Sequence, residues 1–228
     1  NLAIEGGTLK ITSGGDGIRS TYDKTDDSSK GHIFIENADI SITSQNDGIQ
    51  SEKNLIINNG TFNIKTGDGA ESNSSKANSS TGQYGFHVFP NSTQTTDSST
   101  SVSQKGLKSG NDITVNNGTF TLDTYDDAVH SNENVEITGG TFNIKTGDDA
   151  IHADDTLTIK NGTITVSQSH EGLEATAVNI TGGTVDIKSS DDGINSAGGN
   201  DSSGFGGFGG RPQDKFMNQN NTDTQSDT

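Results

Sequence analysis

The chain has 228 residues, of which only 25% are apolar, and it contains 30 glycines and no cysteine. So few apolar residues cannot fill one thick core, which leaves a thin repetitive fold or a disordered chain. The net charge of −17 argues against nucleic acid and anionic membranes as partners, and the lack of cysteine excludes disulfides and thiolate metal sites. No apolar run reaches the roughly 18 residues that a membrane-spanning helix needs.

A short motif, Gly-Thr followed by an apolar residue, recurs along most of the chain. It opens seven similar segments, the second of which has Ala-Asp in place of Gly-Thr. The segments begin at Gly7, Ala38, Gly60, Gly118, Gly140, Gly162 and Gly183. Four of the six steps between them are 22 or 21 residues long, which indicates one structural unit per step. The first and third steps are longer and predict insertions at about residues 21–32 and 67–104.

Apolar and polar residues alternate within each segment. In the fifth segment Phe142 and Ile144 alternate with Thr141, Asn143 and Lys145, which is the two-residue period of a β-strand. Several short strands in 22 residues, repeated in phase, predict coils stacked about 4.8 Å apart around a narrow apolar tube.

The fold class that we predict is therefore all-β, a right-handed parallel β-helix with coils of about 22 residues. The handedness follows the general preference of parallel crossovers, and a β-sandwich is the alternative fold. We expect the β-helix over residues 1–199, as a monomer, and a Gly-, Asn- and Ser-rich tail or linker over residues 200–228.

Acidic residues recur at one corner of the predicted coil, just before a small residue. The acidic residues at these two positions are Asp16, Asp47, Asp126, Asp127, Asp148, Asp149, Glu171, Asp191 and Asp192. Lys105 stands at this corner in the third segment. Stacked unit charges repel by roughly 1 kcal/mol in water and by several times that at lower dielectric. Ca²⁺, which binds carboxylate, carbonyl and water oxygens, would relieve that repulsion, and solvated turns are the alternative interpretation.

A row of polar residues of mixed type follows the acidic corner and is predicted to point away from the tube. It comprises Arg19, Gln50, Lys108, His130, His152, Glu174 and Asn195. Next to a calcium-binding edge, such a row is a candidate sugar-contact surface, and the alternative is the solvated face of a sheet. The predicted carbohydrate-binding residues are Lys108, His130, His152 and Glu174, with His170 beside them. His130 and His152 stack one coil apart but lack an obvious third ligand for Zn²⁺.

Several sequence segments also resemble those of a known protein family. These are "GGDGIRS", "KGHIFIEN", "DDAVHSNENVEITGGTFNIKTGDDAIHADDTLTIKNGTITV", "SHEGLEA" and "SSDDGINSAGG". Over residues 1 to about 199 the chain resembles bacterial carbohydrate-binding domains built on a calcium-binding parallel β-helix, a fold similar to that of family 9 pectate lyases. The resemblance implies a secreted or lipid-anchored surface protein that binds cellulose and acidic plant polysaccharides such as polygalacturonate, with Ca²⁺ as the cofactor.

The resemblance also implies which residues bind calcium. They are Asp126, Asp127, Asp148, Asp149, Glu171, Asp191 and Asp192, with Asp16 and Asp47 as a second group. The sixth segment departs from the double-aspartate pattern with His170-Glu171, which puts one ligand in doubt there.

Three functions remain open from the sequence. The first is a calcium-dependent polysaccharide-binding module, which we favour. The second is a pectate-lyase-like enzyme with Lys105, Lys108 or Arg19 as the base, which calcium would assist by acidifying the proton to be removed. The third is a calcium-stiffened stalk or adhesin repeat. The chain begins inside a strand pattern, so we expect an extracellular or cell-surface protein whose targeting segment lies outside this fragment.

Overall fold

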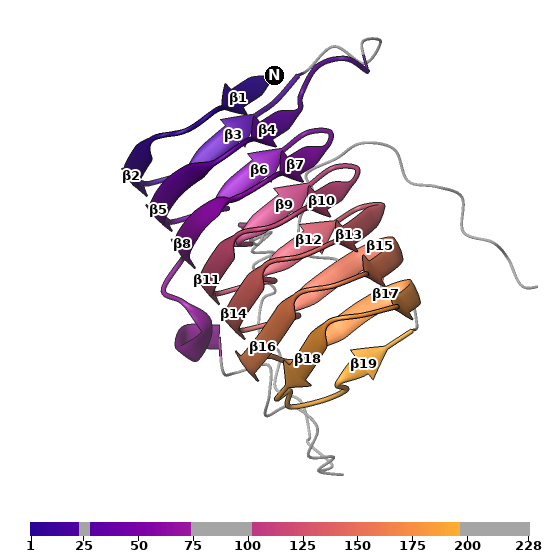
Figure 1. The fold of residues 1–228 in the computed structure, drawn as a ribbon. Coiled ribbons are helices and arrows are strands. Elements are labelled where there is room, and N and C mark those ends of the chain that lie inside the picture. Colours follow the sequence, from indigo (N-terminus) through magenta and orange to yellow (C-terminus); the bar gives the residue numbers. More distant parts are fainter. Residues whose placement is uncertain (23–27, 74–101, 197–228) are drawn as a thin grey trace, which may run out of the picture.

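Parallel strands stack coil upon coil into a solenoid of the β-helix type (Figure 1). The computed structural model describes residues 1–22, 28–73 and 102–196. The predicted tail at 200–228 and most of the predicted insertion at 67–104 lie outside these ranges. No helix in the described ranges has the length and apolar character to cross a membrane.

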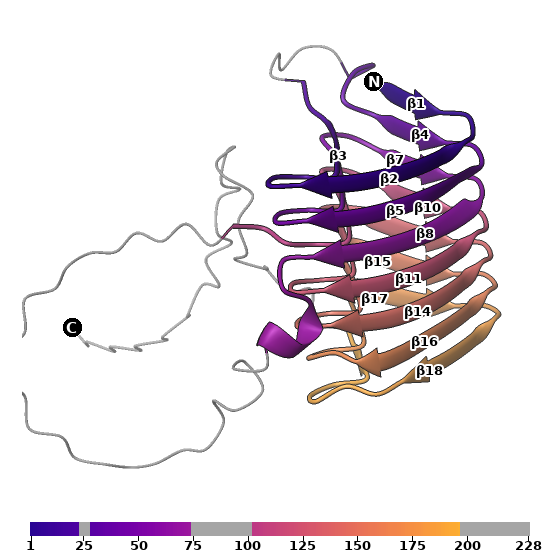
Figure 2. The ribbon, with the colours of Figure 1, turned by 90° about the vertical axis from the view of Figure 1, so that its left-hand side faces the viewer.

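One side of the solenoid is a sheet of seven strands, seen face-on in Figure 2. Each strand begins one of the seven segments that the sequence predicts. In spatial order they are β2 (Thr8–Ser13), β5 (Ala38–Ser44), β8 (Gly60–Thr66), β11 (Thr119–Thr124), β14 (Thr141–Thr146), β16 (Thr163–Gln168) and β18 (Thr184–Ile187).

The remaining strands form one sheet of twelve, arranged as two ladders that merge. The first ladder contains β1 (Leu2–Ile4), β4 (Ile33–Ile35), β7 (Leu55–Ile57), β10 (Ile113–Val115) and β13 (Asn134–Ile137). The second contains β3 (Ile18–Ser20), β6 (Ile49–Ser51), β9 (Leu107–Ser109), β12 (Val129–Ser131) and β19 (Ile194–Asn195). The long strands β15 (Ile151–Ile159) and β17 (Leu173–Ile180) belong to both ladders, and a short 3-10 helix, η1 (Ala70–Asn73), follows β8.

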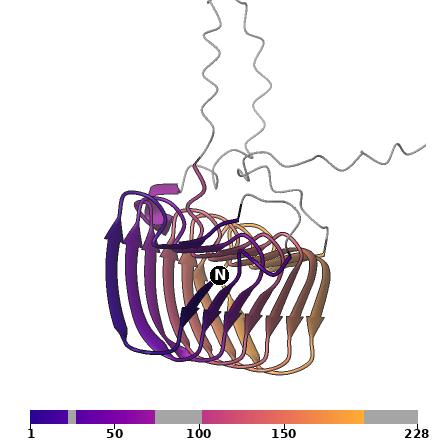
Figure 3. The same cartoon turned by 90° about the horizontal axis from the view of Figure 1, so that it is seen from above.

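The register between coils confirms the period read from the sequence. Phe120 pairs with Phe142, and His130 pairs with His152, each across 22 residues. Viewed from above, successive coils follow one another along a single direction (Figure 3). Asp154 and Asp155 lie within the long strand β15, which pairs with β12 and β13 on one side and with β17 on the other. The register with β17 shifts between Ala153 and Thr156, at these two aspartates.

The core is a set of like-on-like stacks inside the tube. The rings of Phe62, Phe120 and Phe142 are fully buried and stack with centroids 4.7 and 4.4 Å apart. A second stack is polar, since the buried Thr124 hydroxyl donates to the Thr146 hydroxyl at 2.9 Å. In-register pairing of identical side chains thus buries apolar surface while satisfying the few polar groups inside.

A glycine in an unusual backbone conformation stands where most coils enter the seven-stranded sheet, and Ala38 replaces it in the second. Gly140 and Gly162 have φ of 100° and 112°, a region that residues with a Cβ atom rarely adopt. A Cβ atom at Gly162 would also lie 2.9 Å from the Gly140 carbonyl oxygen of the preceding coil. The Asn-Gly motif is therefore a coil corner rather than a hairpin turn.

Candidate functional site

The acidic residues predicted from the sequence lie at one corner, where the seven-stranded sheet gives way to the second ladder. We call this set of stacked positions the acidic corner. Its rungs are tied together by backbone hydrogen bonds, in which the Ala128 and Ala150 amides donate to the Asp149 and Glu171 carbonyls at 3.0 and 3.1 Å. The next residue must be small, since a Cβ atom at Gly48 would lie 2.5 Å from the Ile64 side chain.

At the N-terminal end of the acidic corner the protein supplies its own cations. Asp16 pairs with Arg19 at 3.2 Å, and its Oδ1 accepts the Asp47 amide. Burial and the nearby Asp47 raise the pKa of Asp16. Asp47 is buried and accepts the Lys105 amide at 2.8 Å, with the Lys108 ammonium 3.4 Å from its other oxygen.

Lys105 lies across the next rung and neutralises part of it. Its ammonium is fully buried, 2.5 Å from Asp127 and 3.6 Å from Asp126. Burial raises the pKa of Asp127, but Lys105 and then His130 lower it by more, so the pKa lies well below its ordinary value. Asp127 therefore stays ionised, with the Lys105 ammonium and the His130 ring as its partners.

Three carboxylates from two adjacent coils converge beside Lys105. Asp126, Asp127 and Asp148 are all buried, and one oxygen from each lies within 4.8 Å of the others. We call these residues the oxygen cluster. Oxygen donors alone are the ligands of a hard cation such as Ca²⁺, so the chemistry of this donor set fits the predicted ion.

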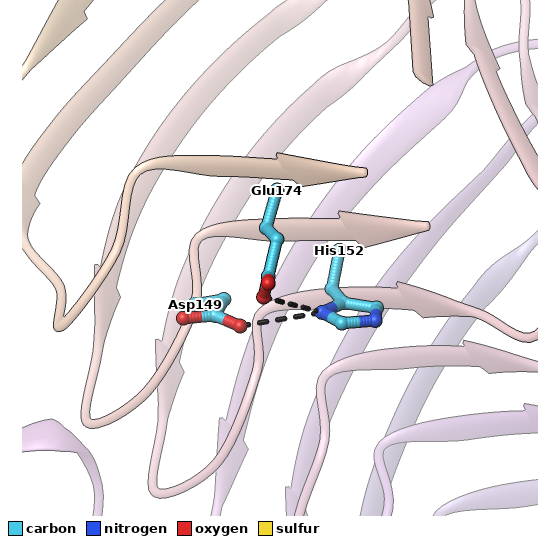
Figure 4. Close-up of side chains that lie close together, drawn as sticks. All are labelled: Asp149, His152 and Glu174. Atoms are coloured by element: carbon cyan, nitrogen blue, oxygen red, sulfur yellow. Dashed lines mark hydrogen bonds and ion pairs between the residues drawn. The ribbon is translucent and has the colours of Figure 1, made fainter. Parts of the chain in front are cut away.

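A second cluster of three contains a nitrogen donor and is drawn in Figure 4. His152 Nδ1 lies 3.0 Å from Glu174 Oε2 and 3.3 Å from Asp149 Oδ2, and all three residues are buried. We call Asp149, His152 and Glu174 the mixed cluster. The mixed cluster joins a residue of the acidic corner to two residues of the outward row, across two coils, and this contact was not predicted from the sequence. The spacing could have indicated it, since Asp149 is three residues before His152 and Glu174 is one coil of 22 residues after it.

Burial and charge act together in the mixed cluster. Burial raises the pKa of Asp149 to about 6, with Asp127 and Glu174 acting in the same direction and the His152 hydrogen bond opposing them. Burial alone would lower the pKa of His152, but its carboxylate neighbours, led by Asp149 and Asp154, raise it to about 11. The ring therefore carries a positive charge when protons are its only ligands.

The C-terminal rungs are more open. Glu171 is half-buried and accepts a hydrogen bond from Asn195 at 3.0 Å, and burial raises its pKa. Asp191 and Asp192 are exposed and belong to neither cluster. The structure thus places all nine predicted metal ligands at the acidic corner, but among the described residues it gathers only four of them into the two clusters.

The predicted sugar-contact row forms one stack but is not a surface. Arg19, Gln50, Lys108, His130, His152, Glu174 and Asn195 pair coil to coil in that order. The exposed fractions of Lys108, His130, His152 and Glu174 are 8% or less. Only His170 of the predicted sugar contacts is half-exposed, with Nδ1 3.4 Å from the Ser190 hydroxyl. Lys108, His130 and His152 face carboxylates of the acidic corner, and Glu174 faces His152. Sugar contact by these residues stays a prediction.

Of three comparisons with known proteins, the one with protein-family models found a match. No curated protein and no solved structure matched the chain. A protein-family model described as carbohydrate-binding domain-containing protein matches residues 1–150 and 148–208, which together cover nearly the whole solenoid. The chain therefore belongs to this family of carbohydrate-binding domain-containing proteins.

Proposed function

We propose that the protein is a calcium-dependent polysaccharide-binding module for plant cell-wall glycans, cellulose and polygalacturonate among them, at a bacterial cell surface. The observation that carries the calcium requirement is the oxygen cluster, three buried carboxylates from adjacent coils within 4.8 Å. Three carboxylates this close repel one another, and the single Lys105 ammonium beside them neutralises only part of their charge. The carbohydrate ligand class comes from the family.

Ca²⁺ suits this cluster better than Mg²⁺. Ca²⁺ accepts six to eight oxygens in flexible geometry, whereas Mg²⁺ needs a near-ideal octahedron and retains its waters. Asp126 and Asp148 are buried but keep 6% and 9% of their surface exposed, which leaves a narrow approach for water. With a net charge of −17 the protein repels polygalacturonate, and bound calcium would reverse that repulsion locally.

The exposed face of the seven-stranded sheet is the surface that we propose for the glycan. Its outward rows are polar and in register, beginning with the threonines Thr61, Thr119, Thr141, Thr163 and Thr184. Between Lys10 and Asp123 these rows enclose a shallow groove of about 270 Å³. Lys10 is exposed and offers an acidic glycan a cationic partner, whereas Lys65 and Lys145 already pair with Asp123 and Glu71 at 3.9 and 2.7 Å.

Lysis is the weaker alternative. A catalytic base must be uncharged and must reach the proton that it removes. Lys105 is fully buried beside two carboxylates, and Lys108 is buried 3.4 Å from Asp47, so neither amine is exposed to a polysaccharide chain. The family is one of binding domains, which is consistent with a protein that is not an enzyme.

Co-sedimentation with cellulose and gel retardation in polygalacturonate, each with calcium or with chelator, test the proposal. We expect binding with calcium, its loss with chelator, and at least about tenfold weaker calcium binding in Asp148→Asn. Asp155→Asn, at an exposed neighbouring position, is the matched control and should behave as wild type.

The other outcomes separate the alternatives. Glycan binding that is indifferent to chelator would overturn the calcium requirement. A calcium-dependent melting temperature without binding to any glycan would support the structural stalk. Release of unsaturated, ultraviolet-absorbing oligogalacturonides would establish a lyase.

A further inference from the structure

The mixed cluster differs chemically from the oxygen cluster, because it contains an imidazole. We propose that Asp149, His152 and Glu174 form a binding site for a divalent transition-metal ion, with Zn²⁺ the ion that fits best. The site is separate from the calcium site of the proposed function and does not depend on it.

The distances between donor atoms suit such an ion. Ligand atoms about 2.0–2.2 Å from Zn²⁺ at tetrahedral angles are about 3.3–3.5 Å apart. His152 Nδ1 lies 3.3 Å from Asp149 Oδ2 and 3.0 Å from Glu174 Oε2. One nitrogen and two carboxylates match the ligand preferences of zinc, and three protein ligands leave the shell open to water or a ligand oxygen.

The other ring nitrogen of His152 has the partner that metal-bound histidines have. Nε2 lies 3.2 Å from Asp154 Oδ1, on the opposite side of the ring from the cluster. A carboxylate there holds the proton on Nε2 and leaves the Nδ1 lone pair directed at Asp149 and Glu174. Strand β15 carries both His152 and Asp154, so the orientation is built into one element.

The N–H groups of a protonated His152 ring are too few to pair with all the carboxylates around it. Three carboxylates, of Asp149, Asp154 and Glu174, face one ring that offers only two N–H groups, so Asp149 and Glu174 share the Nδ1 proton. With a charged ring the group has three negative charges and one positive, a net charge of −2. A neutral ring with a divalent ion instead leaves −1, in a place where uncompensated charge is costly.

The preceding coil provides an internal comparison. His130 occupies the equivalent position and stacks on His152, with ring centroids 4.9 Å apart. Its Nδ1 faces Asp127 at 2.9 Å, but its Nε2 faces the neutral Asn132, and its neighbour in the next coil is His152 rather than an acid. At the two places where the His152 ring meets the carboxylates of Asp154 and Glu174, the His130 ring thus meets an amide and a histidine.

Titration of the chelator-treated full chain with Zn²⁺ and with Co²⁺ as a coloured substitute tests the site. We expect saturable binding of one ion, retained in excess Ca²⁺, with visible Co²⁺ absorption that indicates nitrogen and oxygen ligands. Glu174→Gln and His152→Gln should abolish that absorption, and Asp154→Asn should weaken binding by about 10- to 100-fold. His130→Gln is the matched control and should bind as wild type.

Wild-type spectra keep the test decisive even where a variant does not fold. Correlation spectra of the histidine ring nitrogens should show the Nδ1 resonance of His152 shifting on Zn²⁺ addition while Nε2 keeps its proton. An unshifted His152 ring, no saturable binding, or equal binding by Glu174→Gln would overturn the proposal. Weaker calcium binding in Asp148→Asn with an unchanged Zn²⁺ titration would show that the two sites are independent.

Discussion

Lys105 has a role at the acidic corner that its place in the sequence does not suggest. It stands where other coils have an acid, and its ammonium contacts Asp126 and Asp127 in the following coil. The cation is fully buried, so its removal leaves carboxylates that water cannot solvate. The third coil thus carries a fixed cation where the later coils carry carboxylates.

The variant Lys105→Met tests this role. Loss of one partner from a buried ion pair typically costs about 3–5 kcal/mol, so we expect a loss of that order in the free energy of unfolding when chelator is present. Calcium should restore part of it, because the oxygen cluster then holds a second cation. Urea denaturation with and without calcium measures both effects.

Lys160→Met is the control, since Lys160 and Glu136 form an ion pair at 2.9 Å whose side chains are 51% and 40% exposed. It should change stability by less than about 1 kcal/mol under either condition. An equal loss in both variants, or a Lys105→Met loss that calcium does not reduce, would contradict the role given to Lys105.

At the scale of elements, stability depends on strands that repeat their neighbours. Phe120 in β11 lies between Phe62 in β8 and Phe142 in β14, with both rings stacked on it and no exposed surface. Each of these three strands thus buries its aromatic ring against the next one. The centre of the stack contributes more than either end because it has a partner on both faces.

Phe120→Ala should lower the free energy of unfolding by about 3–5 kcal/mol, because it opens a cavity between two rings that the parallel strands hold apart. Thermal and urea unfolding followed by far-ultraviolet circular dichroism measure the change. Phe34→Ala, at the half-buried outward position of β4, should cost only about 1 kcal/mol. Similar losses of unfolding free energy in the two variants would show that ring stacking inside the tube does not stabilise the fold more than an outward phenylalanine does.

The elements were predictable because period and alternation are properties of the chain itself. The 22-residue step placed Phe120 beside Phe142 and His130 beside His152 without any tertiary information. What the sequence could not supply is the path of the backbone between strands. Whether His152 faces solvent or Asp149 depends on how sharply the corner bends, and that bend results from the packing of neighbouring coils.

The same limit explains two other differences. Asp154 and Asp155 lie inside strand β15, at a register shift between Ala153 and Thr156, whereas the preceding coil has two separate strands there, β12 and β13. The sequence places Lys105 at this corner as a candidate base, and only the structure shows its ammonium on the acids of the next coil. Both depend on contacts between residues that are distant in sequence, which local pattern does not encode.

At the scale of the whole molecule, the solenoid is a row of similar coils, and stability in such a fold is close to a sum over neighbours. Residues 140–161 form one such coil, which begins at Gly140 and ends immediately before Gly162, and both glycines have the same unusual backbone conformation. Because its two ends match, this coil can be followed by a copy of itself without a change of register.

A variant that duplicates residues 140–161 should therefore fold, with an unfolding free energy at least equal to that of the wild type and a longer particle in X-ray scattering. Aggregation or loss of the β-sheet signal would show that the coils are less interchangeable than their register suggests.

The duplication should also change the number of bound ions differently for the proposed calcium site and the proposed zinc site. The inserted coil carries its own copies of Asp148, Asp149 and His152, but Glu174 belongs to the coil that follows. The first histidine would then stack against a second histidine, as His130 does now, so sites made only of oxygen multiply while the nitrogen-containing site stays single. An added coil would thus raise the number of calcium ions bound per chain by about one and leave the number of zinc ions unchanged. The ratio of calcium to zinc would then depend on the number of coils.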